Sequence, residues 1–134
     1  MAISILSAKQ FKGNLKATIQ ATGKLGFTSD TAKTLNLSSE RHAKFAKDDE
    51  SGTLYLIIIN ESNEDAFPIR ESSGYYYAST ARMFDMLGLD YVNMTIMFDL
   101  VRQATLDEPL QGEVYLMRKR QKQRNEKVHE DDTT

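Results

Sequence analysis

The chain contains two segments in which the same order of sequence patterns occurs. Each segment has two strand-like stretches joined at a glycine, then a short helical pattern, then two further strand-like stretches. The segments cover about residues 16–60 and 66–117. A sequence repeat of this size folds into the same supersecondary unit each time it occurs. The sequence therefore predicts one fold with two similar strand-strand-helix-strand-strand halves.

The spacing of particular residues supports the repeat. Leu35 and Leu87 each precede an apolar residue of a later strand-like stretch by ten positions. A Gly-x-x-Tyr-Leu pattern starts at Gly52 and occurs again at Gly112. Identity between the two segments is low, so the alternative to a duplication is chance agreement between two strand-rich stretches.

Hydrophobic periodicity assigns the elements within each half. Residues 92–99 alternate as in a half-buried strand, and Leu54–Ile59 is apolar throughout, as in the middle of a sheet. Two short helices are expected, one at Thr31–Leu35 and one within the segment Thr80–Leu89 that ends at Gly88. The expected N-caps are Ser29 or Asp30 for the first helix and Ser79 or Thr80 for the second. These elements predict an α+β fold, a β-rich barrel or sheet that buries one face under two helices.

Length and the charged end of the chain set the domain boundaries. A chain of 134 residues favours a single domain, expected over residues 1–117. From Arg118 onward no apolar residue occurs before Val128, and the chain ends in acidic and polar residues. Such a composition cannot bury surface, so residues 118–134 are predicted to form a flexible, charged C-terminal tail outside the core.

Charge is distributed unevenly along the chain, although the formal net charge is only −2. Residues 1–47 hold eight basic and two acidic residues, whereas residues 48–117 hold three basic and thirteen acidic residues. This asymmetry indicates either a surface that faces a polyanion or a basic half that docks on an acidic one. The plainer alternative is that both sets are solvated surface.

The residues from Gly23 to Glu50 resemble the AbrB/MraZ-type swapped-hairpin DNA-binding family, over residues 16–58 and more loosely over 67–117. The matching positions are Gly23, Lys24, Leu25, Phe27, Leu35, Leu37, Phe45 and the turn Asp48-Asp49-Glu50. The resemblance implies that two copies in one chain form a pseudo-twofold barrel, which the family otherwise builds by dimerising. It also implies a DNA-binding transcriptional regulator. Only the first copy would keep a basic edge, because the second has Tyr75–Tyr77 in place of Lys24–Gly26.

The candidate nucleic-acid-binding residues are basic side chains of the first half and one tyrosine of the second. Lysine and arginine neutralise phosphates, and an exposed tyrosine on a sheet can stack on single-stranded bases. The alternative for the three tyrosines at 75–77 is that two of them pack in the core. The candidates are Lys12, Lys16, Lys24, Lys33, Arg41, Lys44 and Tyr76, with the basic tail as an auxiliary arm.

Enzymatic patterns are missing from the sequence. There is no cysteine and there are only two histidines, which argues against thiolate or histidine-rich metal sites. No phosphate-binding glycine loop, nucleophile elbow or His-Glu-x-x-His motif occurs. We therefore expect no catalytic activity, no cofactor, no metal and no small-molecule substrate.

Apolar runs are short, and the longest strongly apolar stretch is strand-sized. The N-terminus lacks a basic segment followed by an apolar core and a cleavage site. From these two features we expect a cytoplasmic protein without membrane contact.

The competing interpretation is a protein–protein or self-assembly module. Basic and acidic halves can pair between chains through complementary charge, which would give a homodimer. Salt-dependent nucleic-acid binding and the mass in solution distinguish this interpretation from a nucleic-acid-binding one.

Overall fold

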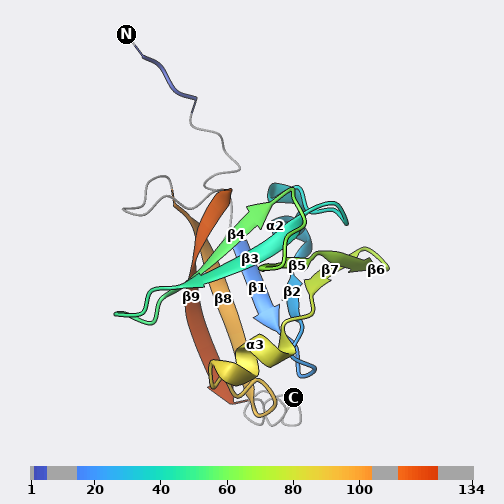
Figure 1. The fold of residues 1–134 in the computed structure, drawn as a ribbon, viewed down its shortest axis with the longest axis vertical. Coiled ribbons are helices and arrows are strands. Elements are labelled where there is room, and N and C mark those ends of the chain that lie inside the picture. The colour runs from blue at the N-terminus through green and yellow to red at the C-terminus, as the bar shows by residue number, and fades with distance from the viewer. Residues whose placement is uncertain (1, 6–14, 104–111, 124–134) are drawn as a thin grey trace, which may run out of the picture.

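The computed structural model describes residues 2–5, 15–103 and 112–123. Residues 15–103 and 112–123 form a strand-rich, nearly closed antiparallel barrel with two short helices (Figure 1). The helices are α2 (Ser29–Thr34) and α3 (Ala81–Met86). The strands are β1 (Leu15–Ile19), β2 (Leu25–Phe27), β3 (His42–Lys47), β4 (Leu54–Ile59), β5 (Ala66–Pro68), β6 (Arg70–Ser72), β7 (Tyr75–Ala78), β8 (Met94–Arg102) and β9 (Glu113–Gln123). Their order in the sheet is β5-β3-β4-β9-β8-β1-β2-β7-β6, and every neighbouring pair is antiparallel.

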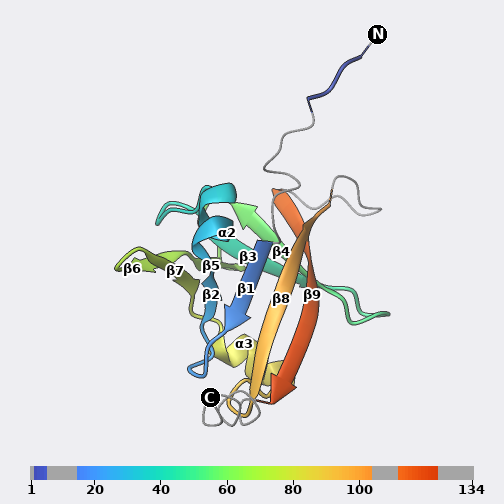
Figure 2. The same ribbon diagram turned by 180° about the vertical axis from the view of Figure 1, so that it is seen from behind.

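The two ends of this strand order meet in space. β5 and β6 stand at opposite ends of the order, yet only Ile69 separates them along the chain. The Ile69 amide donates a hydrogen bond of 3.1 Å to the carbonyl of Arg41, next to the start of β3. One bent stretch of chain therefore joins both ends of the sheet, and the strands wrap around a common interior in Figures 1 and 2.

Alternating residues of the strands fill this interior. Ala17 and Ile19 of β1 and Ile96 and Phe98 of β8 are fully buried. Successive strand residues point to opposite faces, so the residues between them point outward. Phe84 of α3, also fully buried, stacks on Phe98 with ring centroids 6.2 Å apart. Phe84 thus packs α3 against the sheet, as the expected burial of one sheet face under the helices requires.

Both helices end in the same way. After α2, the Leu37 amide donates to the Ala32 carbonyl (2.9 Å), and after α3, the Leu89 amide donates to the Phe84 carbonyl (3.1 Å). Asn36 and Gly88 stand in the matching positions with φ of 54° and 74°. Glycine adopts this left-handed conformation without strain and asparagine tolerates it. The predicted stop at Gly88 is confirmed, and Asn36 has the same position after α2.

The N-cap of α2 is Thr28, whereas Ser29 or Asp30 was expected. The Thr28 hydroxyl accepts a hydrogen bond of 3.3 Å from the Thr31 amide. The hydroxyl of Thr31 in turn accepts 2.7 Å from the Lys16 amide, which ties α2 to β1. For α3 the N-cap is Thr80, one of the two expected residues, but its hydroxyl donates to the Gly23 carbonyl at 3.0 Å.

The strand prediction for Leu54–Ile59 is confirmed residue for residue. The boundary of the charged tail is wrong, because β9 continues through Arg118 to Gln123. These residues pair with β8, for example Asp99 with Arg118. Backbone hydrogen bonds to a long partner strand extend a strand without requiring apolar side chains on it. The remainder of the predicted tail, 124–134, lies outside the described residues.

Candidate nucleic-acid interface

Outward-facing residues of five adjacent strands form one continuous surface. These strands are β7, β2, β1, β8 and β9, of which β2, β1, β8 and β9 lie side by side in Figure 2. The registers align Lys16 with Asp99 and Asp99 with Arg118, all on the outside of the barrel. One row further along, Met97 of β8 aligns with Arg120 of β9.

This surface is rich in positive charge, and we call it the basic sheet face. Among the described residues of these strands and the adjoining β6, it has one outward carboxylate, that of Asp99, which forms an ion pair of 3.0 Å with Arg120. Five cationic side chains remain in addition to this pair. The six cations of the basic sheet face are Lys16, Lys24, Arg70, Arg118, Arg120 and Lys122.

Two tyrosines lie at the β7 side of the basic sheet face. Tyr75 and Tyr77 stack with centroids 6.2 Å apart and ring planes 22° from parallel. The Lys24 ammonium lies over the Tyr77 ring, 4.7 Å from its centroid. This cation–π contact holds a positive charge directly beside an aromatic surface.

Tyr75 reaches across β2 to the end of β1. There its hydroxyl accepts a hydrogen bond from the side-chain amide of Gln20, the residue that follows β1. It crosses above Gly26, and a Cβ at Gly26 would collide with the Tyr75 hydroxyl. A glycine inside a strand often marks such a close approach. The position of Tyr75 on the sheet therefore depends on the missing side chain at residue 26.

Tyr76 points in the other direction. It packs against the hydrophobic core, and its hydroxyl bonds to the Glu71 side chain. This bond to a carboxylate raises the pKa of the Tyr76 phenol above its ordinary value. The candidate stacking residue Tyr76 is thus placed inward, and its neighbours Tyr75 and Tyr77 are placed outward.

The structure brings together only two of the predicted cations. Lys16 and Lys24 lie on the basic sheet face, on β1 and directly before β2. Lys44 lies on β3, which β4, β9 and β8 separate from β1 in the sheet. Lys33 is exposed on α2, and Lys12 lies outside the described residues.

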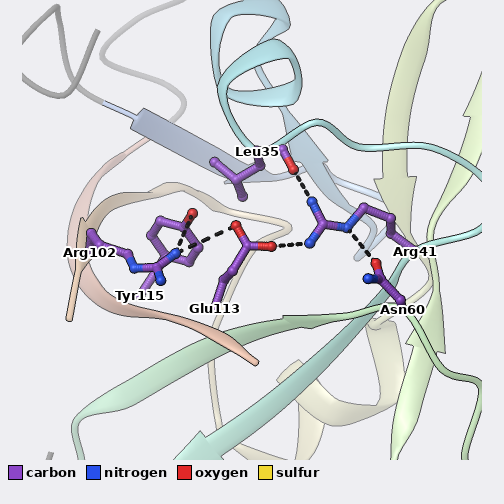
Figure 3. Close-up of polar contacts among 6 residues, drawn as sticks. All are labelled: Leu35, Arg41, Asn60, Arg102, Glu113 and Tyr115. Carbon is purple, nitrogen blue, oxygen red and sulfur yellow. Dashed lines mark hydrogen bonds and ion pairs between the residues drawn. The ribbon is translucent and has the colours of Figure 1, made fainter. Parts of the chain in front are cut away.

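Arg41 is occupied by contacts within the protein (Figure 3). Its guanidinium forms an ion pair with Glu113 and donates to the Leu35 carbonyl and, at 3.1 Å, to the Asn60 side chain. The side chain is only 13% exposed. These contacts join the end of α2 to the ends of β4 and β9, and they give Arg41 a structural role.

A second arginine shares the same carboxylate. Arg102 lies 3.5 Å from Glu113, and its guanidinium lies over the Tyr115 ring, 5.4 Å from the centroid (Figure 3). Its side chain is 54% exposed. Arg102 is therefore the solvent-facing member of the cluster and Arg41 is the enclosed one.

Exposed acidic residues gather on loops that connect other strands. The β3–β4 turn and the β4–β5 loop contain Asp48, Asp49, Glu50, Glu61, Glu64 and Asp65. The amides of Glu50 and Ser51 donate to the Asp48 carboxylate, and these bonds lower its pKa. These loops connect β3, β4 and β5, which do not belong to the basic sheet face.

An open groove of about 590 Å³ lies beside β9, between α3 and the β3–β4 turn. Leu54, Leu89 and Phe98 contribute apolar lining, and Lys119 contributes positive charge. Arg118 borders the groove as well as the basic sheet face. Positive charge therefore continues around β9.

Three residues of this surface were not among the candidates: Arg70, Tyr75 and Tyr77. Arg118, Arg120 and Lys122 belong to the basic segment that was predicted as an auxiliary arm, and the structure places them on strand β9. The sequence does not show this strand, because the intervening Lys119 and Gln121 are also polar and leave no apolar–polar alternation. A long apolar strand such as β8 needs a partner of similar length, and this requirement points to the same extension.

Within the described ranges no group of three metal-ligating side chains occurs, and neither helix is long and apolar enough to cross a lipid bilayer. No protein-family model, curated protein or solved structure is significantly similar to this chain.

Proposed function

We propose that this protein is a non-enzymatic nucleic-acid-binding protein that binds its ligand through the basic sheet face. The observation that carries the proposal is the gathering of six cations and a single carboxylate on five adjacent strands and β6. A continuous cationic surface concentrates a polyanion and gains affinity by releasing counterions from its phosphates.

The strand topology supports the two-halves repeat that the resemblance implies. Each half contains a hairpin, a helix and a second hairpin, with β1, β2, α2, β3 and β4 corresponding to β5–β6, β7, α3, β8 and β9. If each element is replaced by its counterpart in the other half, every strand pair of the sheet maps onto a strand pair that also exists in the sheet. The pair β1·β8 becomes β5·β3, β1·β2 becomes β6·β7, and β3·β4 becomes β8·β9, while β2·β7 and β4·β9 convert into themselves.

The proposal predicts a steep salt dependence of binding. If all six cations neutralise phosphates, affinity for a mixed-sequence oligonucleotide should fall about 10³-fold between 50 and 200 mM salt. Reversing two charges in Lys16→Glu with Lys24→Glu should abolish detectable binding at physiological salt. The measurement is fluorescence anisotropy of a labelled oligonucleotide across a salt series.

A matched control reverses one lysine of α2 and one of β3, in Lys33→Glu with Lys44→Glu. This variant changes the net charge by the same amount on elements outside the basic sheet face. It should retain most of the affinity. Equal loss in both variants would show that overall charge governs binding, and no binding of the wild type at low salt would refute the proposed function.

A further inference from the structure

Resting on the proposed function, we infer that the ligand of the basic sheet face is a single-stranded polynucleotide, with a base stacked on Tyr75 and with Tyr77 supporting the Tyr75 ring. The phosphates would lie along Lys16 and the cations of β9. Two features carry this inference: the width of the face, and the position of the tyrosines beside the cations.

The width of the face does not fit the grooves of a duplex. Neighbouring strands lie about 4.8 Å apart, so the five strands from β7 to β9 span roughly 19 Å before side chains are added. The major groove of B-DNA is about 12 Å wide and admits a helix or a two-stranded ribbon. The face can touch the outer phosphates of a duplex but cannot reach its base edges, whereas a single strand presents its bases directly.

The tyrosines supply a surface suited to unpaired bases. Tyr75 is 37% exposed, and its ring is nearly parallel to that of Tyr77. Aromatic side chains on a sheet stack on successive bases with little sequence preference, while neighbouring cations follow the backbone. Lys24 stands over Tyr77, where its ammonium can contact the phosphate that adjoins a stacked base.

One row of outward residues links the tyrosines on β7 to the arginines on β9. It runs from Tyr77 through Gly26, Thr18 and Met97 to Arg120. The Tyr75 ring fills the space above Gly26, because this residue has no side chain, and the position of the ring is therefore built into the sheet.

The test compares three labelled probes in fluorescence anisotropy at low salt: a dT 15-mer, a U 15-mer and a 15-base-pair DNA duplex. At least one of the two single strands should bind 10-fold or more tightly than the duplex, and the comparison of dT with U identifies the sugar that is preferred. Tyr75→Leu and Tyr77→Leu should each weaken single-strand binding about 10-fold and leave duplex binding unchanged.

Two further variants separate stacking from damage to the fold. Tyr75→Phe keeps the ring and loses only the hydroxyl that bonds Gln20, so it should bind within about twofold of wild type. Tyr55→Leu removes a tyrosine from β4, outside the face, and should not change binding. Quenching of intrinsic tyrosine fluorescence by the dT 15-mer should disappear in the double variant of Tyr75 and Tyr77.

The outcomes are distinct. Duplex binding as tight as single-strand binding, with the tyrosine variants unchanged, would overturn the single-strand inference and leave the proposed function intact. Absence of salt-sensitive binding to all three probes would overturn the proposed function itself.

Discussion

At the scale of single residues, the role of a charged side chain depends on its neighbours in space. Arg41 and Lys24 are both basic residues of the first half. The guanidinium of Arg41 bonds Glu113, Leu35 and Asn60, whereas the ammonium of Lys24 lies over a tyrosine ring on an open surface. The first arrangement stabilises the fold, and the second leaves a cation near solvent for a ligand.

The enclosed position of Arg41 predicts a loss of stability in Arg41→Ala. The substitution leaves the Leu35 carbonyl and the Glu113 carboxylate without their main partner, which should lower the free energy of unfolding by about 1–3 kcal/mol. Urea denaturation followed by circular dichroism measures this change. Arg102→Ala serves as the control, because an exposed pair at 3.5 Å contributes at most about 1 kcal/mol. Equal losses in the two variants would contradict the structural role given to Arg41.

At the scale of elements, the helices show how far local sequence decides local structure. The two helix ends have the same hydrogen bonds and differ in one residue, Asn36 after α2 and Gly88 after α3. A backbone with positive φ ends each helix because it turns the chain away from the helical path. Because this signal depends on consecutive residues, the sequence alone predicts that α3 ends at Gly88.

A pair of substitutions at Gly88 tests this view of the helix ends. A Cβ at residue 88 meets nothing within 4 Å, so any loss of stability comes from the left-handed backbone with φ of 74°. Gly88→Ala should lower the free energy of unfolding by about 1–2 kcal/mol. Gly88→Asn should lower it less, because asparagine already stands at the matching position 36. Urea denaturation of both variants decides the matter, and an equal loss for alanine and asparagine would count against it.

Strand β9 shows the limit of local reading. Its last six residues are polar or charged, and by composition alone they resemble a disordered tail. They form a strand because β8 offers a matching row of backbone hydrogen-bonding groups. The length of a strand is therefore partly a property of its partner.

At the scale of the whole molecule, the basic sheet face takes its cations from both halves of the chain. Lys16 and Lys24 come from the first half, whereas Arg70, Arg118 and Arg120 come from later in the sequence. Division of the sequence into a basic half and an acidic half therefore does not describe the surface. Association of two chains through complementary charge stays a prediction, and the mass in solution tests it.

Closure of the sheet within one chain predicts a monomer. The end strands β5 and β6 are joined through Ile69, so the described strands leave no long open edge on which a second copy could add a strand. Size-exclusion chromatography with light scattering should give a mass near 15.2 kDa. A mass of about twice that value, persisting on dilution and at high salt, would favour the self-assembly interpretation.

Local features of the sequence determined the strand at Leu54–Ile59, the strand alternation around Ile96 and Phe98, and the end of α3. Each of these depends on the periodicity or conformation of neighbouring residues. The tertiary structure alone decided which charges share a surface, since register brings Lys16 next to Asp99 and Asp99 next to Arg118 across two strand pairings. It also decided that Tyr75 lies over Gly26, 49 residues away in the chain. Pairing between distant segments depends on the closed sheet as a whole, and no window of consecutive residues contains that information.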